Sequence, residues 1–277
     1  MKNFFICEYS APNIRTHHSV TMEETMTYII DISDKRNAII KETLDQKLLN
    51  TKVYTKNIKC QPFDTYIFSP AKKWTSDEAL SLSDSTTVIC GKINEEISSI
   101  FISKNITHKN VMEDEIFTIK NANLTAEGTL SLIIENSPKS IFESNILILG
   151  AGRIAKALAI LLGRLGVKYS IARFNKEKFP ECFTYCNSCL FGENFVNHLQ
   201  SFDVIVNTIP KVIFDKEKIK KIKKDSILIE TASVDCLDRD LVENFTFIHA
   251  PALPQRYSAQ TAAKIMLESI LGENNYV

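Results

Sequence analysis

The residues whose types and spacing point most directly to chemistry form a short glycine turn, Gly150-Ala151-Gly152-Arg153-Ile154-Ala155. The first glycine permits a tight turn, and the second has no Cβ to block a ligand that approaches the backbone. The small alanine lets a following helix pack close to the preceding strand. Backbone N–H groups at the start of a helix bind phosphate, so this G-x-G-x-x-A pattern predicts a pyrophosphate site at residues 150–154.

The segments on both sides of the turn have the periodicity that such a site requires. Ile146 to Leu149 is an apolar run typical of a strand buried on both faces. Apolar residues then recur at helical spacing as far as Gly166, and 167–172 has the composition of a second strand. Strand, glycine turn, helix and strand in this order predict a dinucleotide-binding βαβ unit. The alternative is a unit of this fold that has lost its ligand.

The residue at the end of the second strand predicts which dinucleotide binds. NAD-binding units usually carry Asp or Glu there to hold the ribose 2′-hydroxyl. This chain has Arg173, which cannot accept a hydrogen bond from a hydroxyl but pairs with a 2′-phosphate. We therefore predict NADP as the cofactor and NAD as the less favoured ligand. The alternative is that Arg173 only stacks on the adenine ring.

The composition excludes several classes of protein. The 277 residues contain 33 Lys and Arg against 33 Asp and Glu, so nothing indicates binding to nucleic acid or to a membrane surface. No apolar run is long enough to span a bilayer, and Glu8 interrupts the N-terminal segment too early for a signal peptide. We expect a cytoplasmic protein whose seven cysteines are reduced.

Three of the cysteines, Cys182, Cys186 and Cys189, have the spacing of a radical-forming iron–sulfur site. That spacing usually carries an aromatic residue before the last cysteine, where this chain has Ser188. The segment also falls inside the predicted nucleotide-binding unit. We therefore expect buried apolar side chains there and no metal site.

Alternating strands and helices predict two α/β domains. The first of them is a smaller N-terminal α/β domain over residues 1–124, in which roughly the first 25 residues are irregular. Its strands are expected at 26–32, 52–56, 65–68, 86–90 and 108–112, and its helices at 34–49 and 94–103. An interdomain helix at 125–136 leads into a Rossmann domain over residues 125–277, a doubly wound parallel sheet with further strands at 203–206, 227–230 and 245–249. We expect a helix at 216–224, and a C-terminal helix at 257–271 that packs back on the first domain.

In open parallel sheets, ligands bind beyond the carboxyl ends of the strands. Besides the glycine turn, this rule selects the segments that follow the strands ending near 206, 230 and 249. We expect Asn207 and Thr208 to line the cofactor cleft near the nicotinamide, with Pro210 shaping the turn. Ala250 and Pro251 are expected to contact the cofactor from the last strand.

These motifs together resemble the dipicolinate synthase family, in its NADP-binding component. The resemblance extends from about residue 111 to 271, and its matching segments are Asn121-Ala122-Asn123-Leu124-Thr125-Ala126-Glu127-Gly128, the glycine turn, Ala172-Arg173, Asn207-Thr208-Ile209-Pro210, Ala232-Ser233, Ala250-Pro251-Ala252-Leu253-Pro254 and Thr261-Ala262. Upstream it is thin, with Asp34-Lys35-Arg36 similar to the family's Asp-x-Arg. A Pro-Gly-Gly of the family is replaced here by Val234-Asp235-Cys236.

The resemblance implies a divergent NADP-linked oxidoreductase that converts dihydrodipicolinate into dipicolinate (pyridine-2,6-dicarboxylate) during sporulation. It also implies a flavoprotein-like partner (the B component), an oligomeric complex, and the cytoplasm of the mother cell as location. The substrate is a small dicarboxylate, so cations or N–H donors must hold two carboxylates.

The same resemblance suggests catalytic residues. Glu127 is the only acid in its matched motif and is the candidate base, with a role as an ordinary acid of the first helical turn as the alternative. Lys120 and Arg256 flank matched motifs and are the candidate carboxylate ligands, with solvent-exposed cations as the alternative. Thr125 is expected to cap the interdomain helix, and His249 is a less favoured proton-transfer candidate.

Two rival functions remain. An oxidoreductase of another small acid, with the layout of shikimate dehydrogenase, also fits the Asn-Thr-x-Pro turn. A non-catalytic NADP-binding partner is the second rival, suggested by the glycines lost at 234–236.

Overall fold

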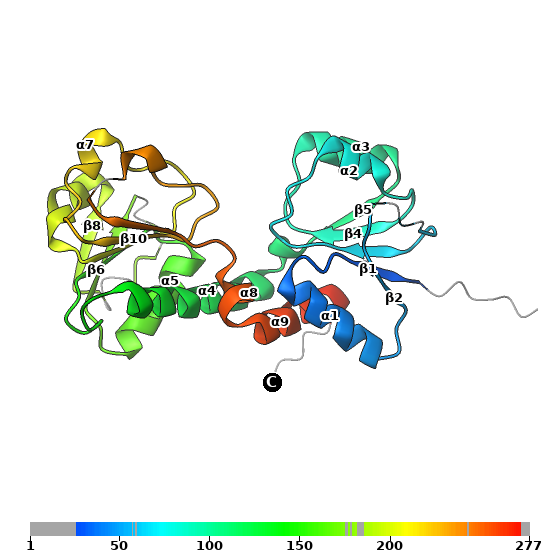
Figure 1. Cartoon of the computed structure of the whole chain (residues 1–277), viewed down its shortest axis with the longest axis horizontal. Helices are drawn as coiled ribbons and strands as arrows, with labels where there is room; N and C mark the ends of the chain where they lie inside the picture. Colours follow the sequence, from blue (N-terminus) through cyan, green and yellow to red (C-terminus); the bar gives the residue numbers. More distant parts are fainter. Residues whose placement is uncertain are drawn as a thin grey trace, which may run out of the picture.

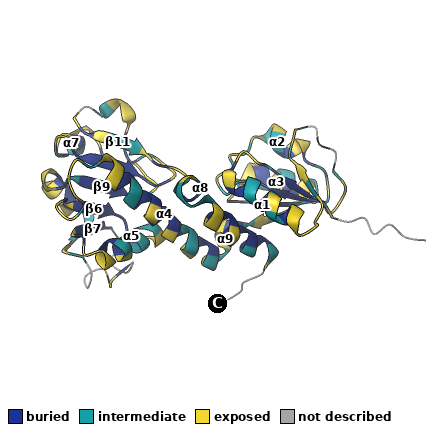
Figure 2. Cartoon of the chain, turned by 60° about the horizontal axis from the view of Figure 1, so that its bottom comes forward, coloured by how far each residue is buried: buried dark blue, intermediate teal, exposed yellow. Residues whose placement is uncertain are grey.

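The computed structural model describes residues 26–272, apart from 57, 59, 175, 176, 178, 182–185 and 243. Two parallel sheets form two units that are joined on one side by helices (Figure 1). The buried residues gather on the strands at the centre of each unit (Figure 2). This arrangement confirms the predicted two-domain α/β class. The irregular segment predicted for the first 25 residues lies outside the described residues.

The first sheet has five strands in the order β2-β1-β3-β4-β5. They are β1 (Tyr28–Ile30), β2 (Thr51–Val53), β3 (Thr65–Ile67), β4 (Thr87–Cys90) and β5 (Thr107–Asn110), connected in part by α1 (Lys35–Gln46), α2 (Ser76–Ser81) and α3 (Glu95–Ser103). Successive strand residues face opposite sides, so Ile30 and Ile67 pack with α1 whereas Ile29 and Tyr66 pack with α2 and α3. Helix α2 was not predicted, although Thr75 begins it with a capping box.

The second sheet has six parallel strands in the order β11-β10-β9-β6-β7-β8, which is the doubly wound order of a Rossmann fold. Its strands are β6 (Ile146–Leu149), β7 (Tyr169–Arg173), β8 (Ser188–Phe191), β9 (Val204–Asn207), β10 (Ile227–Glu230) and β11 (Thr246–His249). Helix α5 (Arg153–Arg164) covers one face, and the 3-10 segment η2 (Gly192–Ser201) and α7 (Lys216–Ile219) cover the other. The predicted C-terminal Rossmann sheet is therefore confirmed.

Two helical predictions near this sheet need correction. The helix expected at 216–224 ends at Ile219, because the buried Ile222 belongs to a turn and Asp225 adopts a left-handed φ of 63° just before β10. The interdomain helix does not begin at 125. Helix α4 spans Glu115–Asn136, and its cap is Asp114, whose carboxylate accepts hydrogen bonds from the N–H groups of Ile116 and Phe117 at 2.9 and 3.1 Å.

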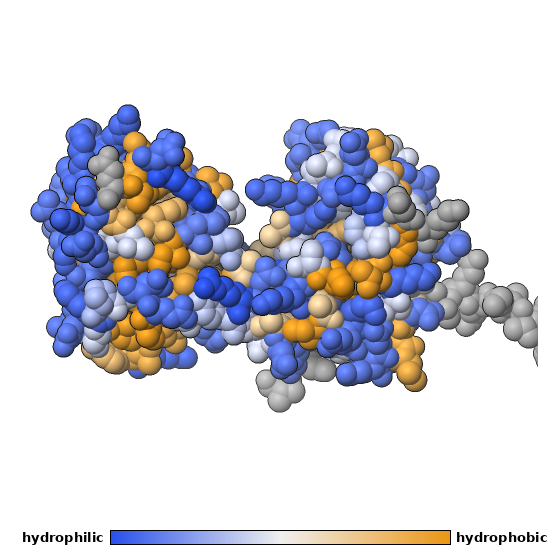
Figure 3. Space-filling model, in the orientation of Figure 1, coloured by the Kyte–Doolittle hydropathy of each residue, from blue (hydrophilic) through white to orange (hydrophobic). Residues whose placement is uncertain are grey.

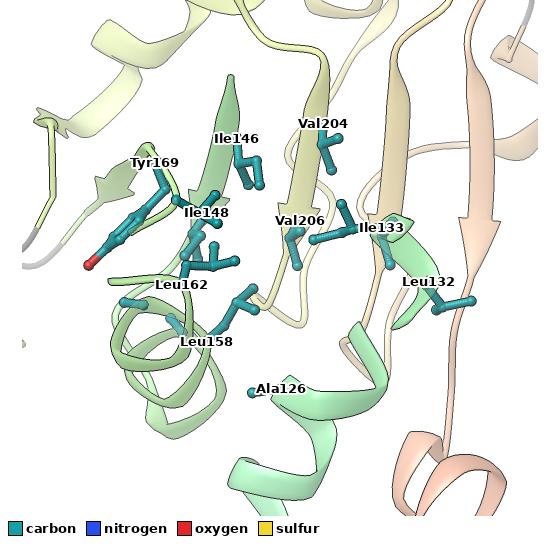
Figure 4. Close-up of a cluster of buried hydrophobic side chains, with 14 of the residues drawn as sticks. Ala126, Leu132, Ile133, Ile146, Ile148, Leu158, Leu162, Tyr169, Val204 and Val206 are labelled. Atoms are coloured by element: carbon teal, nitrogen blue, oxygen red, sulfur yellow. The ribbon is translucent and has the colours of Figure 1, made fainter. Parts of the chain in front are cut away.

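Helix α4 connects the two units and contributes to both cores. Its N-terminal half places Phe117 and Leu124 among the strands of the first sheet. Its C-terminal half packs Leu132 and Ile133 against the second sheet, in the same core cluster as Leu158 of α5 (Figure 4). The domain division predicted at 124/125 therefore falls inside one continuous helix.

The chain returns to the first unit through α8 (Leu253–Tyr257) and α9 (Ala259–Leu271). Met266 of α9 is fully buried in the same core cluster as Ile40 of α1. Lys109 of β5 donates 2.9 Å hydrogen bonds to the carbonyls of Ser269 and Ile270 near the end of α9. The C-terminal helix thus completes the first core, and the two units are tied together by α4 and by the α8–α9 segment.

The strands of both sheets run toward the space between the units (Figure 1). In the space-filling view the two units stand apart above the helices that join them (Figure 3). The carboxyl edges of both sheets therefore face each other, which is where the sequence rule locates a ligand. No helix in the described part of the chain is long and apolar enough to cross a membrane.

Candidate functional site

The glycine turn has the geometry of a phosphate cradle. Gly150 has a φ of 122°, and its N–H donates to the carbonyl of Ala172 at 2.8 Å. A Cβ on Gly150 would lie 2.2 Å from Oγ1 of Thr208, so no other residue fits there. Gly152 is the N-cap of α5, and a Cβ on it would meet nothing within 4 Å. The backbone N–H groups at the start of α5 are therefore open to a pyrophosphate, and the residues present fit a dinucleotide.

The turn borders a cleft of about 250 Å³ at the carboxyl edge of the second sheet. The cleft lies between the segments that follow β6, β7 and β9, and its lining residues are Gly150, Ala151, Gly152, Phe174, Thr208, Ile209, Pro210 and Lys211. The structure thus brings together the predicted residues 150–152, Thr208 and Pro210. Phe174 and Lys211 were not predicted.

Arg153 begins α5 and points across to α4. Its guanidinium forms an ion pair with Glu115, with Nε 3.3 Å from Oε1. The two residues line a second cavity of about 490 Å³ on the α4 side of the glycine turn. The carboxylate of Glu115 raises the pKa of Arg153, and Arg153 lowers the pKa of Glu115. Ile154, the next predicted residue, is half-buried and lines neither cavity.

Arg173 lies at the end of β7, where the sequence predicted it. Its side chain is only 5% exposed, and Nη1 donates to the carbonyl of Phe179 at 3.1 Å. The guanidinium is therefore held against the backbone of Phe179 and does not line the cleft. Its predicted contact with a 2′-phosphate requires this contact to open.

Asn207 was expected to line the cleft, but it is fully buried. Its Nδ2 donates to both carboxylate oxygens of Glu230 at 2.9 Å and to the carbonyl of Ile209 at 2.9 Å, and its Oδ1 accepts from the N–H of Ile209. The amide is occupied by these partners, so it shapes the turn from beneath. Thr208 does face the cleft, and its hydroxyl donates to the carbonyl of Leu149 at 2.8 Å.

Ala250 and Pro251 follow β11 at the same edge of the sheet. Ala250 is buried, and its N–H donates to the carbonyl of Glu230 at 2.9 Å, whereas Pro251 is exposed. The next residue, Ala252, has a left-handed φ of 55° and caps α8. A non-glycine residue in this conformation is uncommon, so the turn is held in place by its surroundings.

A second polar group, which the sequence did not predict as a unit, lies at this edge. Asp235, in the loop after β10, is 2.8 Å from Nδ1 of His249 at the end of β11 and 2.7 Å from Nε of Arg239. The Arg239 guanidinium and then His249 hold the pKa of Asp235 below its usual range. Asp235 stands where the resembled family has glycine, so the departure from the family pattern places a carboxylate beside the imidazole of His249.

The three predicted catalytic residues do not share a cavity. Glu127 lies in the middle of α4, not in its first turn, and its Oε2 accepts from the hydroxyl of Ser258 at 3.3 Å. Lys120 pairs with Glu268 of α9 at 2.9 Å. Arg256 is exposed and lies 5.1 Å from the ring of its neighbour Tyr257. Their catalytic roles stay predictions.

Thr125 does not cap a helix. It lies inside α4, and its hydroxyl donates to the carbonyl of Asn121 at 2.9 Å. Gly128 has a packing role, because a Cβ there would lie 2.9 Å from Cβ of Leu253 and 3.0 Å from Cδ2 of Tyr257. The glycine at the end of the matched motif thus lets α8 lie directly against α4.

Cys186 and Cys189 are partly buried and pack against the core of the second unit. The third cysteine of that predicted cluster, Cys182, lies outside the described residues. Among the described residues there is no group of three or more His, Cys, Asp or Glu side chains that could hold a metal ion.

Comparison with known proteins agrees with a nucleotide-binding second unit. Residues 123–245 match the family model described as D-isomer specific 2-hydroxyacid dehydrogenase, NAD binding domain. The fold, the glycine turn and this match define a two-domain oxidoreductase with a Rossmann unit for a nicotinamide dinucleotide.

One named protein recurs in the sequence and the structural comparisons. This chain is 23% identical over 169 residues to the A subunit of dipicolinate synthase from Bacillus subtilis (strain 168), a match that covers 59% of this chain and 57% of that relative. The chain thus spans a little over half the length of this relative in the sequence match.

Two solved structures with the same name superpose on nearly the whole chain. The crystal structure of the A subunit of dipicolinate synthase from Bacillus halodurans gives a TM-score of 0.77 at 18% identity, covering 91% of this chain and 98% of the other. The corresponding protein from Bacillus subtilis gives 0.73 at 19% identity, with 90% and 96% covered. The resemblance predicted from the motifs is confirmed, and the structural likeness shows a common fold.

Proposed function

We propose that this protein oxidises dihydrodipicolinate to dipicolinate with NADP, as the A subunit of a dipicolinate synthase in the mother-cell cytoplasm of a sporulating bacterium. A flavoprotein-like B subunit is its proposed partner. The observation that carries the proposal is the coincidence of two resemblances to the same named protein, in the sequence motifs around the site and in the arrangement of both units.

The overall reaction removes two hydrogens from the dihydropyridine ring. A bound nicotinamide supplies the acceptor for one of them, a hydride, and the chain must take the other as a proton. Glu127 is the proposed proton acceptor, because it is exposed on α4 beside the cavity of about 450 Å³ that α4 forms with α5. Lys120 and Arg256 are the proposed carboxylate ligands. Since Lys120 pairs with Glu268, substrate binding must break that pair.

NADP is the proposed cofactor because no acid occupies the end of β7. Among the described residues that line the cleft there is no Asp or Glu to accept a hydrogen bond from a ribose 2′-hydroxyl in the way that NAD-binding units do. Arg173 at this strand end and Lys211 in the cleft are both cationic, which favours a phosphate.

The direct test is turnover. Purified protein, with and without the product of a neighbouring flavoprotein-like gene, is mixed with NADP and with dihydrodipicolinate generated in situ. The expected result is formation of NADPH, seen by its absorbance, in step with pyridine-2,6-dicarboxylate, and at least tenfold slower turnover with NAD. No turnover in the presence of both proteins overturns the proposal.

A second candidate is an oxidoreductase of another small acid. The observation that favours it is the match of residues 123–245 to a 2-hydroxyacid dehydrogenase domain, together with the replacement of the family's Pro-Gly-Gly by Val234-Asp235-Cys236. A screen of 2-hydroxyacids and shikimate with NADP and NAD separates the two candidates. Turnover of one of these acids without turnover of dihydrodipicolinate selects the second. Nucleotide binding without turnover of any acid selects a non-catalytic partner.

A further inference from the structure

We propose that Lys211 binds the 2′-phosphate of NADP and that it, rather than Arg173, sets the preference of this protein for the phosphorylated dinucleotide. The inference rests on the proposed function, because it assigns one end of the same nucleotide site. It names a residue that neither the glycine motif nor the resemblance includes.

Arg173 is poorly placed for this role. Its side chain is 5% exposed, and Nη1 donates to the carbonyl of Phe179. A phosphate can pair with this guanidinium only if that contact opens. If the buried guanidinium gives up its hydrogen bond to bind a phosphate, the free energy of the lost hydrogen bond offsets part of the free energy that the new contact contributes. Arg173 therefore supports the turn in the described structure.

Lys211 is exposed and lines the cleft with Gly150 and Gly152. Within the part of the chain that the structure describes, it forms no ion pair with a carboxylate. Other cations near the glycine turn are already paired, Arg153 with Glu115 and Lys156 with Glu181. Among the described cations near this turn, Lys211 is thus the one whose ammonium can bind a phosphate without breaking an ion pair with a carboxylate.

The position of Lys211 matches the ribose end of a dinucleotide. In this fold the 2′-hydroxyl lies at the end of the second strand of the unit, here β7, which ends at Arg173. Phe174 follows directly, and the Nζ atom of Lys211 lies 5.1 Å from the centre of its ring. The ammonium therefore stands over the residue that adjoins the expected 2′ position.

The backbone of Lys211 is also held in place. Its N–H donates to the carbonyl of Ile209 at 2.8 Å, and Ile209 is itself fixed by two hydrogen bonds to the buried Asn207. Proline at 210 restricts the chain just before the lysine. A turn held in this way loses little backbone conformational entropy when the lysine that it presents to the cleft binds a phosphate.

The test separates the phosphate from the rest of the cofactor. Dissociation constants for 2′,5′-ADP and for 5′-AMP are measured by calorimetry on the full chain for wild type, Lys211→Gln and Lys221→Gln. Lys221 is an exposed lysine outside the cleft, so its variant removes the same charge without touching the site. Arg173→Gln is measured in parallel, with its thermal midpoint as a check on folding.

Wild type and Lys221→Gln are expected to bind 2′,5′-ADP roughly ten- to hundredfold more tightly than 5′-AMP, and Lys211→Gln is expected to bind both about equally. If the ratio of the two dissociation constants in Lys211→Gln equals that of wild type, the inference is overturned. If only a folded Arg173→Gln variant loses the preference for 2′,5′-ADP, Arg173 is the residue that binds the 2′-phosphate. Equal binding of both nucleotides by wild type also overturns the inference, but it does not contradict oxidation of the same substrate with NAD. Failure of wild type to bind either nucleotide overturns the proposed function as well.

Discussion

The amide of Asn207 holds the carboxylate of Glu230 at the centre of the nucleotide-binding sheet, with Nδ2 2.9 Å from both carboxylate oxygens. Both side chains are fully buried at the adjacent ends of β9 and β10. The N–H groups of Ala232 and Cys236 also donate to this carboxylate, at 2.8 Å each. Glu230 thereby fixes the loop after β10 and, through Asn207, the turn that borders the cofactor cleft.

Asn207→Ala is expected to lower the free energy of unfolding by about 2–4 kcal/mol at pH 8, because it removes donors from a buried carboxylate. Burial raises the pKa of Glu230, so lowering the pH protonates this group in the folded state and reduces the penalty. Urea unfolding at pH 8 and pH 5 measures both effects. Asn136→Ala removes a hydrogen bond to the carbonyl of Leu132 near the end of α4 and serves as the control, with an expected loss of about 1 kcal/mol at either pH. A loss in Asn207→Ala that is the same at both pH values contradicts the account.

Substitutions of the two glycines of the turn are expected to have different effects on stability and on nucleotide binding. Gly150→Ala places a methyl group 2.2 Å from Oγ1 of Thr208 at a φ of 122°, so the variant is expected to lose several degrees of thermal midpoint and its nucleotide binding. Gly152→Ala meets no atom within 4 Å, so the fold is expected to keep its midpoint. Its methyl group occupies the approach to the helix N–H groups, and NADPH affinity is expected to fall at least tenfold.

Thermal unfolding and NADPH fluorescence titration measure the two effects separately. Gly163→Ala is the matched control, because it lies in the same helix and its methyl group would be 3.6 Å from the hydroxyl of Tyr169, an ordinary contact. This control should bind NADPH like wild type. Full NADPH affinity in Gly152→Ala would show that the cofactor does not approach the turn.

The sequence predicted the second sheet well because its signals are local. Four-residue apolar strands are specified by their own composition, and the glycine turn is specified by the backbone geometry at Gly150. The predicted start of α4 was ten residues too late. The first turns of this helix carry polar residues on the solvent side, and their apolar residues pack on the first unit. Helix α2, with six residues, is too short for periodicity to reveal, and only the Thr75 capping box marked it.

The site was predicted in part for the same reason. Motif reasoning found the turn but could not tell that Asn207 faces the buried Glu230 rather than the cleft, since that depends on which strands are neighbours. Lys211 carried one signal, its position directly after the Asn-Thr-Ile-Pro turn. The contact between Asp235 and His249 joins segments that are 14 residues apart and depends on the pairing of β10 with β11.

Glu127 is predicted to accept the proton in the proposed reaction. Glu127→Gln is expected to lower kcat by roughly two to four orders of magnitude, while NADPH affinity and the thermal midpoint stay at wild-type values because the side chain is exposed. Glu135→Gln is a close control, since Glu135 is also exposed on α4 and accepts a 3.1 Å hydrogen bond from Tyr257, as Glu127 does from Ser258. Equal activity of the two variants would exclude Glu127 as the base, and His249→Asn would be the next variant to assay.

The stability of the second unit is expected to depend on Asp203 in a defined pH window. Asp203 directly precedes β9, at the edge of the sheet opposite the cleft. Its carboxylate accepts from the N–H of Asn145 at 2.9 Å and from Lys139 and Lys223 at 3.1 and 2.5 Å. Although partial burial opposes ionisation, the Asn145 N–H and the two lysines hold the pKa of Asp203 at about 2, below the ordinary 3.8. A carboxyl whose pKa is lowered in the folded state stabilises the fold above its unfolded pKa and loses that effect as the pH falls toward the folded value.

Asp203→Asn is therefore expected to cost about 1–2 kcal/mol of unfolding free energy at pH 7, and the gap to wild type is expected to shrink to about half by pH 3. Urea unfolding at pH 7, 4 and 3 measures the gap. Asp240→Asn is the control, since this acid is exposed on a 3-10 turn and its loss should change stability by less than about 0.5 kcal/mol at every pH. Because Asp203 lies at the end of the sheet away from the cofactor cleft, NADPH affinity at pH 7 should not change. A gap that stays constant from pH 7 to pH 3 would mean that the three hydrogen bonds do not favour the ionised carboxylate.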